Sequence, residues 1–219
     1  MKIIFWDVDT QYDFMMSNGK LYVPGAEEII PNLEKLTRYA REKSIPILGS
    51  VDYHNPDDPE ISDQPDFKQT FPPHCLKGEP GQEKIEATRP QSPLWIDSEP
   101  IDLDRLKQMV EAHRGEIIFR KQRFDVFSNP NVEPVLAMIR PQAIVVYGVA
   151  LDVCDMYAME GFLRIGKYHL YLVEDATRPI DPERGQELIK KWAEKGVHIV
   201  QTRDVVEKEI LFQSPETVA

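Results

Sequence analysis

Cys154 is the residue whose type and setting most clearly suit covalent chemistry. It lies in GVALDVCDMYAMEG, where a short apolar stretch leads into a pattern typical of a helix. A thiol at a helix N-terminus faces unpaired backbone N–H groups and the positive end of the helix dipole, and we expect both to lower its pKa from about 8.5. Cys154 is therefore a candidate nucleophile, and the alternative is an inert thiol packed in the core.

Two charged residues could support such a nucleophile. Asp9 follows the apolar run KIIFWDV, and Lys121 ends the run EIIFRK. If both runs are strands of a parallel sheet, the two side chains lie at its carboxyl edge, where open α/β sheets bind their ligands. Asp9 could take the thiol proton, while Lys121 could keep Asp9 ionised and offset the charge that develops during attack. The alternatives are a helix-capping aspartate and a surface lysine.

A second group of residues has the chemistry of metal ligands. Asp52 and His54 are two residues apart in SVDYH, so an extended chain projects both side chains to one side. His74 follows twenty residues after His54, in PPHC. One carboxylate and two imidazoles suit Zn²⁺, Fe²⁺ or Mn²⁺ and leave positions open for water or substrate. Glu60 is a candidate fourth ligand, and ordinary polar residues of an acidic loop are the alternative.

The elements that must position these residues are visible as an alternation of short apolar runs with amphipathic stretches. This alternation predicts buried parallel strands joined by helices, in a three-layer α/β/α sandwich. Residues 53–100 have almost no apolar periodicity, so we expect a long loop there. The predicted strands are 2–8, 45–51, 116–121, 143–149, 169–173 and 197–202, and the predicted helices are 26–43, 102–113, 153–165 and 182–195.

Length and composition limit the class of protein. A chain of 219 residues suits one α/β domain, which we predict to span 1–212, with a flexible tail at 213–219. A formal net charge of −11 argues against nucleic-acid and anionic-membrane partners. No apolar run approaches the roughly 18 residues that would span a bilayer. With only two cysteines and no secretory leader pattern, we expect a reducing, cytoplasmic location.

Together these segments resemble the isochorismatase-like cysteine hydrolases and, within them, the nicotinamidases. The resemblance implies a six-stranded, mainly parallel sheet flanked by helices, with Asp9, Lys121 and Cys154 as the catalytic triad. It also implies a cis peptide between Val149 and Ala150, with the backbone N–H groups of Ala150 and Cys154 forming an oxyanion hole. The matching segments, in family order along nearly the whole chain, are DTQYDF, LYVPGAEEI, SVDYH, FPPHCLKGEPG, RKQRF, YGVALDVC and LVEDATRP.

The resemblance to nicotinamidases also implies a role for the candidate metal ligands. In nicotinamidases the positions of Asp52, His54 and His74 bind a divalent metal that holds the pyridine nitrogen of nicotinamide, and Glu60 falls where a further ligand occurs. The candidate walls for the flat aromatic ring are Phe14, Phe71 and Phe127.

The leading functional prediction is a metal-dependent hydrolase of amide C–N bonds that converts nicotinamide to nicotinate and ammonia, a reaction of NAD metabolism. The alternative is a relative acting on a carbamoyl or linear amide, such as N-carbamoylsarcosine, ureidoacrylate, maleamate or biuret. The segment RFDVF favours this alternative, because Asp125 and Val126 stand where nicotinamidases usually have small residues. Isochorismate cleavage is disfavoured, because that branch lacks the cysteine nucleophile.

Three further expectations complete the sequence-based picture. A non-catalytic scaffold would have a Cys154 thiol of ordinary reactivity, so alkylation of that thiol distinguishes it from an enzyme. The segment 84–115 looks longer than in compact members of the family, and we expect it to cover or reshape the entrance to the site. The expected partner is a small-molecule amide, and assembly with further copies of the chain stays open.

Overall fold

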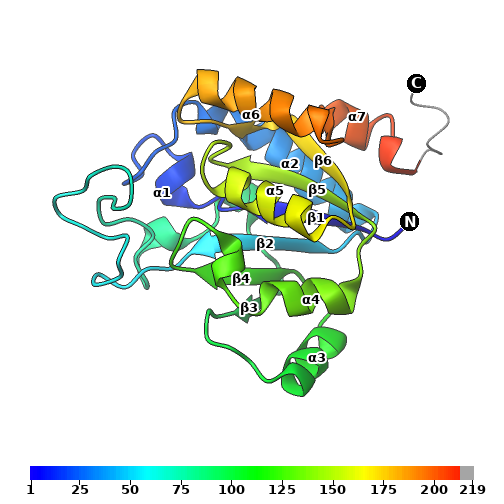
Figure 1. The fold of residues 1–219 in the computed structure, drawn as a ribbon, viewed down its shortest axis with the longest axis horizontal. Coiled ribbons are helices and arrows are strands. Elements are labelled where there is room, and N and C mark those ends of the chain that lie inside the picture. The colour runs from blue at the N-terminus through cyan, green and yellow to red at the C-terminus, as the bar shows by residue number, and fades with distance from the viewer. Residues whose placement is uncertain (213–219) are drawn as a thin grey trace.

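A seven-stranded sheet forms the centre of the fold in the computed structural model, which describes residues 1–212 (Figure 1). The predicted flexible tail, 213–219, lies outside the described residues. Neighbouring strands pair in parallel throughout, in the order β3-β4-β2-β1-β5-β6-β7. The strands are β1 (Ile3–Val8), β2 (Ile47–Asp52), β3 (Leu94–Ile96), β4 (Ile117–Lys121), β5 (Ala143–Val149), β6 (His169–Arg178) and β7 (His198–Val200).

Helices cover both faces of this sheet, which confirms the predicted three-layer α/β/α sandwich. One face packs against α2 and α7, and the other packs against α3, α4, α5 and α6. Between residues 1 and 212, no helix combines the length and the apolar character needed to cross a membrane. The helices are α1 (Tyr12–Met15), α2 (Ala26–Glu42), α3 (Leu103–Ala112), α4 (Val132–Ile139), α5 (Cys154–Ile165), α6 (Pro182–Glu194) and α7 (Thr202–Val206).

The predicted count of six strands is wrong by one, and the helices α1, α4 and α7 were not predicted. The additional strand is β3, a three-residue edge strand that pairs only with β4 and is too short to show a period-2 pattern. The longest of these three helices is α4, whose sequence VEPVLAMI is apolar on most sides and contains Pro134. That proline lies in the first turn, where its missing N–H would have had no helical partner, so the helix tolerates it.

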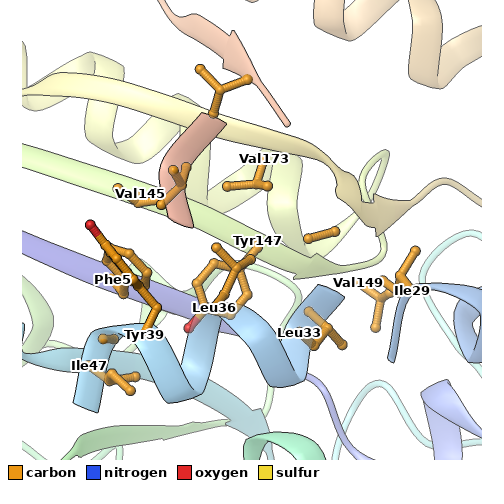
Figure 2. Packing of buried hydrophobic residues seen from close by; sticks show 14 of the residues in the cluster. Phe5, Ile29, Leu33, Leu36, Tyr39, Ile47, Val145, Tyr147, Val149 and Val173 are labelled. Carbon is orange, nitrogen blue, oxygen red and sulfur yellow. The ribbon is translucent and has the colours of Figure 1, made fainter. Parts of the chain in front are cut away.

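Helix α2 holds the centre of the sheet from one side. Its buried residues include Leu33, Leu36 and Tyr39, which recur at intervals of three and form one apolar face. Figure 2 shows these side chains beside Phe5 of β1 and Tyr147 of β5. The ring of Phe5 stacks on Tyr39 at 6.3 Å between centroids and meets Tyr147 edge-on at 6.0 Å. This packing holds the strands that lead into the candidate site.

The strand order brings four strand ends together at one edge of the sheet. The strands β4, β2, β1 and β5 are direct neighbours, and the chain leaves β1 toward β2 on one side before it reaches β5 on the other. The strand order therefore reverses between β1 and β5, and ligands of open α/β sheets bind at such a switch point. The register pairs Asp52 directly with Lys121, and pairs Val8 with both Ser50 and Gly148.

Candidate active site

Asp9, Lys121 and Cys154 meet at the switch point. Asp9 follows β1, Lys121 ends β4, and Cys154 begins α5 after β5. The Lys121 Nζ atom lies 2.8 Å from Asp9 Oδ2 and 3.6 Å from Cys154 Sγ. All three side chains are buried. The predicted convergence of three strand ends is therefore what the fold produces, because parallel strands place their carboxyl ends at one edge.

The backbone of Asp9 has an unusual conformation that aims its carboxylate. Its φ of 45° lies in the left-handed region, which non-glycine residues seldom adopt unless their surroundings require it. The Asp9 N–H donates to Ser50 O at 3.2 Å, and the Ser50 hydroxyl donates to Asp9 Oδ1 at 2.7 Å. One carboxylate oxygen is therefore fixed by Ser50, and the other faces the Lys121 ammonium.

Lys121 is the central cation of the site. Its ammonium donates to Asp52 Oδ1 as well as facing Asp9, and its side chain has no exposed surface. Burial alone would lower the pKa of Lys121, but the charges of Asp52, Asp9 and Cys154 outweigh burial and hold that pKa well above its ordinary value. Lys121 therefore stays protonated and supplies positive charge, so the base must be another group.

The expected lowering of the Cys154 pKa is wrong. Burial raises the pKa of this thiol well above its ordinary value, and Lys121 lowers it only in part, while Asp9 raises it further. Desolvation penalises the thiolate more than the helix start and the lysine favour it. Cys154 therefore rests as a neutral thiol and needs an acceptor for its proton. The carboxylates of Asp9 and Asp52 lie within 4.8 Å of its Sγ atom.

The loops beyond β2 form a second cluster next to the first. The Nε2 atoms of His54 and His74 each lie 3.7 Å from Asp52 Oδ2, and the three ligand atoms lie within 4.8 Å of one another. The loops meet because the His54 N–H donates to Cys75 O at 3.2 Å, and Lys77 N–H donates to His54 O at 2.9 Å. These contacts bring His74 beside His54 although the two are far apart along the chain.

This cluster fits a divalent metal ion. The Nδ1 atom of His74 lies 2.7 Å from Pro72 O, an outer contact that typically orients a metal-binding imidazole with Nε2 inward. Among residues 1–212, the buried Nε2 of His54 has no hydrogen-bond partner, although burying such a nitrogen without a partner is costly. Two nitrogens and one carboxylate oxygen match the ligand preferences of Zn²⁺, Fe²⁺ and Mn²⁺.

Glu60 lies near this cluster but outside it. The three-ligand group found in the described part of the chain contains Asp52, His54 and His74 without Glu60. One Glu60 oxygen accepts from the Phe124 N–H at 3.2 Å, and the other has no hydrogen-bond partner among the described residues. Burial, with a further contribution from Asp52, raises the pKa of Glu60 to about 7. Its role as a fourth ligand stays a prediction.

A cavity with mainly apolar walls connects the two clusters. Cys154, His74 and Asp52 line it together with the predicted aromatic residues Phe14 and Phe71. The rings of Phe14 and His74 lie 5.5 Å apart, so the aromatic wall extends to the candidate metal site. The remaining lining residues are Leu21, Val23, Phe124, Val149, Ala150, Val153 and Ile180.

The predicted third wall, Phe127, is wrong, and Phe124 takes its place. Phe127 is not among the residues that line the cavity, and its ring packs edge-on against Phe162, 5.5 Å away. The chain turns there because the Asp125 side chain accepts from the Phe127 N–H at 2.9 Å and caps a short 3₁₀ helix, while Val126 enters the core. Phe124 meets Phe71 edge-on at 5.3 Å. Its nearness to the end of β4 was the only sequence signal for it.

The expectation that 84–115 covers or reshapes the entrance to the site stays a prediction. None of its residues lines the cavity found in the described part of the chain. The segment instead forms β3 and α3 at the β4 side of the sheet, where α3 projects from the lower part of the molecule in Figure 1. The additional length therefore widens the sheet by one edge strand.

The turn before α5 contains the implied cis peptide, between Val149 and Ala150. The Ala150 carbonyl accepts from the N–H groups of Val153 and Asp155, at 3.0 and 3.1 Å. These bonds close a tight loop around the start of the helix. The N–H of Cys154 belongs to the first helical residue, which has no partner within the helix. It is therefore suited to bind an anionic oxygen beside Sγ.

Comparison with known proteins identifies the family. A model of the isochorismatase domain matches residues 4–101 and 95–204, so the chain belongs to the isochorismatase family of hydrolases. Nicotinamidase 1 of Arabidopsis thaliana is 28% identical over 131 residues, which cover 58% of this chain. The match covers only 46% of that relative, so the chain aligns with less than half of its length.

Solved structures show the same fold. The pyrazinamidase of Pyrococcus horikoshii in complex with zinc is 23% identical, with a TM-score of 0.71 over 92% of this chain and 99% of its own. The nicotinamidase/pyrazinamidase of Bacillus subtilis is 19% identical, with a TM-score of 0.72 over 92% and 100%. The N-carbamoylsarcosine amidase of Thermoplasma acidophilum is 23% identical, with a TM-score of 0.68 over 92% and 97%. The fold is thus shared by enzymes named for different amides.

Proposed function

We propose that the protein is an amidohydrolase that converts nicotinamide to nicotinate and ammonia, with Cys154 as nucleophile. The observation that carries this proposal is that the Asp52 carboxylate belongs to both clusters. Asp52 Oδ1 accepts from Lys121, beside the thiol, and Asp52 Oδ2 faces the imidazoles of His54 and His74. Both clusters open on one aromatic-lined cavity, which suits a flat ring carrying a carboxamide.

The chemistry begins with the neutral thiol. As Sγ of Cys154 attacks the carboxamide carbon, Asp9 accepts the thiol proton and a C–S bond forms. The backbone N–H groups of Ala150 and Cys154 bind the oxyanion, and Lys121 stabilises the negative charge around it. Asp9 then returns the proton to the nitrogen, so the C–N bond breaks and ammonia leaves. Water hydrolyses the thioester, Asp9 accepts its proton, and the protonated thiol is restored when the carboxylate leaves.

The metal ligands serve substrate orientation in this proposal. Asp52, His54 and His74 would hold the ion, with Glu60 as candidate fourth ligand. A divalent ion supplies a Lewis-acid contact for a ring nitrogen. The rings of Phe14 and Phe71 would confine the substrate ring, so that its carboxamide faces Cys154.

The case for a carbamoyl or linear amide is weaker in the folded chain. RFDVF favoured it because two unusual residues stand in that segment, but Asp125 caps a 3₁₀ helix and Val126 packs in the core. Neither residue lines the cavity. A linear carbamoyl acid would need polar partners for its far end, whereas the walls include Leu21, Val23 and Ile180.

An ammonia-release assay tests the proposal. We expect release from nicotinamide by the metal-loaded protein, loss of release after chelation, and recovery when Zn²⁺, Fe²⁺ or Mn²⁺ is added back. The Cys154→Ser variant controls for contaminating amidases. Release from N-carbamoylsarcosine, ureidoacrylate, maleamate or biuret without release from nicotinamide would instead establish the alternative. Full activity in thoroughly metal-free protein would contradict the proposed role of the metal ligands.

A further inference from the structure

A buried ion pair that the mechanism does not use lies behind the catalytic aspartate. Lys84 Nζ is 3.0 Å from Asp7 Oδ2, and the two side chains are only 1% and 4% exposed. Asp7 lies in the central strand β1, where an unpaired carboxylate would be strongly destabilising. Apolar residues of similar size often serve at such positions at least as well. The pair therefore calls for an explanation other than stability.

Thr10 joins this pair into a closed network. Its hydroxyl donates to Asp7 Oδ1 at 2.8 Å and lies 3.1 Å from Lys84 Nζ and 2.7 Å from the Thr88 hydroxyl. A hydroxyl has one donor and two acceptor sites, so Lys84 and Thr88 must both donate to Thr10. Every hydrogen-bonding site of the Thr10 hydroxyl is then used, which fixes its side chain in one orientation.

Backbone hydrogen bonds attach the whole segment around Lys84 to the turn that follows β1. The Ile85 N–H donates to Thr10 O at 3.0 Å, and the Tyr12 N–H donates to Glu83 O at 2.9 Å. Between these bonds, Gln11 and Lys84 form an antiparallel bridge. Lys84 is therefore held in place by the same turn that its ammonium contacts.

Asp9 lies between two members of this network along the chain. Among residues 1–212, however, no hydrogen bond or ion pair joins Asp9 to Lys84. Asp7 and Thr10 flank it along the chain, and Lys84 holds both. The left-handed φ of 45° at Asp9 needs support from its neighbours. A fixed strand end before Asp9 and a fixed side chain after it supply that support.

We propose that Lys84 is a positioning residue for the reaction: it pins Asp7 and Thr10 and thereby holds the Asp9 carboxylate beside Cys154. The proposal rests on the proposed function, in which Asp9 is the proton acceptor. Lys84 itself touches neither Sγ nor the cavity. Its effect is therefore on the geometry of Asp9, and a displacement of Asp9 by about 1 Å is enough to lower the rate about 100-fold.

The test uses the Lys84→Met variant of the whole chain and two readouts. The first needs no substrate: iodoacetamide alkylation of Cys154, followed by mass spectrometry of its peptide and compared with wild type and Asp9→Asn. We expect the alkylation rate of Cys154 in Lys84→Met to differ from the wild-type rate and to lie close to the rate in Asp9→Asn. The second is ammonia release from nicotinamide, for which we expect kcat to fall about 10- to 100-fold with KM unchanged.

Two further variants separate positioning from stability. Asp7→Leu/Lys84→Met replaces the whole pair by apolar side chains, and we expect it to fold even if Lys84→Met alone does not, because it leaves no buried charge unpaired. We expect this double variant to alkylate at the same shifted rate as Lys84→Met. Arg41→Met is the matched control, because it breaks the partly buried Arg41–Glu116 ion pair. Glu116 lies at the amino end of β4, away from the carboxyl ends where the catalytic residues meet. We expect wild-type alkylation and kcat from this control.

The outcomes are distinct. Wild-type alkylation by folded Lys84→Met, or recovery of the wild-type rate in the double variant, would overturn the positioning role. If wild-type protein releases no ammonia from any amide tested, the proposed function fails. The alkylation comparison still decides whether Lys84 controls the placement of Asp9.

Discussion

Asp155 gives the sharpest quantitative prediction, because it is a buried carboxyl next to the nucleophile. Its side chain is fully buried in the first turn of α5, and the Thr177 hydroxyl donates to its Oδ2 at 2.5 Å. Its Oδ1 has no hydrogen-bond partner among residues 1–212. Burial raises the pKa of Asp155 to about 8, and the charges of Asp9 and Asp7 act in the same direction. This carboxyl is therefore mostly protonated at neutral pH.

A raised carboxyl pKa makes stability depend on pH with a definite sign. In the unfolded chain the pKa of an aspartate is about 3.9, so between about pH 4 and pH 8 the folded state holds a proton that the unfolded state lacks. The free energy of unfolding then falls as pH rises, by about 1.4 kcal/mol per pH unit. Between pH 5 and pH 8 Asp155 alone removes up to about 4 kcal/mol of stability.

The perturbation is Asp155→Asn, which replaces the protonated acid by a neutral group of similar shape. Urea denaturation at pH 5, 6, 7 and 8 should show the variant close to wild type at pH 5 and more stable by up to about 4 kcal/mol at pH 8. Glu160→Gln is the control. Burial raises the Glu160 pKa, but hydrogen bonds from Lys195 and Lys191 outweigh burial and hold that pKa at about 2.

The control should differ from wild type by the same amount at every pH from 5 to 8, because neither the folded pKa nor the unfolded pKa of Glu160 lies in that range. A stability difference between Asp155→Asn and wild type that is likewise flat across this range would refute the reasoning. It would mean that Asp155 is ionised in the folded protein.

Three further predictions follow from the site. Cys154→Ala should lower amide hydrolysis by roughly 10⁴-fold or more with the circular dichroism spectrum unchanged, and residual thioester formation detected by mass spectrometry would contradict this. Lys121→Met leaves the buried carboxylates of Asp9 and Asp52 without their cation, so the free energy of unfolding in urea at pH 7 should fall by about 3–5 kcal/mol. A loss of free energy smaller than that of Arg41→Met would contradict this prediction. Phe124→Ala should raise KM for an aromatic amide, because Phe124 lines the cavity. Phe127→Ala should leave KM unchanged and lower the free energy of unfolding by about 3 kcal/mol, because its ring packs on Phe162. The reverse pattern would place Phe127 in the cavity.

Much of the fold was predictable because strand and helix periods are local properties of the chain. Each predicted strand overlaps an observed one, and the four predicted helices correspond to α2, α3, α5 and α6. The pattern missed β3, α1 and α7, which are too short for a period, and α4, which is apolar on most of its surface. The strand β3 also depends on residues that are remote in sequence, because it exists by pairing with β4.

The candidate site likewise has a part that could be predicted from the sequence and a part that could not. The convergence of Asp9, Lys121 and Cys154 was predictable, because each follows or ends a strand and parallel strands share one carboxyl edge. The choice of Phe124 over Phe127 was not, because it depends on one hydrogen bond from the Phe127 N–H to the Asp125 side chain. The spacing of residues along the sequence does not predict that local change in the direction of the chain.

The sequence by itself determined which residue types are available, their order, and the edge of the sheet at which they meet. Only the tertiary structure decided their electrostatic states. The pKa of Cys154 is raised instead of lowered, and Lys121 holds two carboxylates, because desolvation and Coulomb interactions sum over groups from several strands. The same is true of the Lys84–Asp7 pair, whose partners are joined only when the part of the long loop around Lys84 folds back onto the turn after β1.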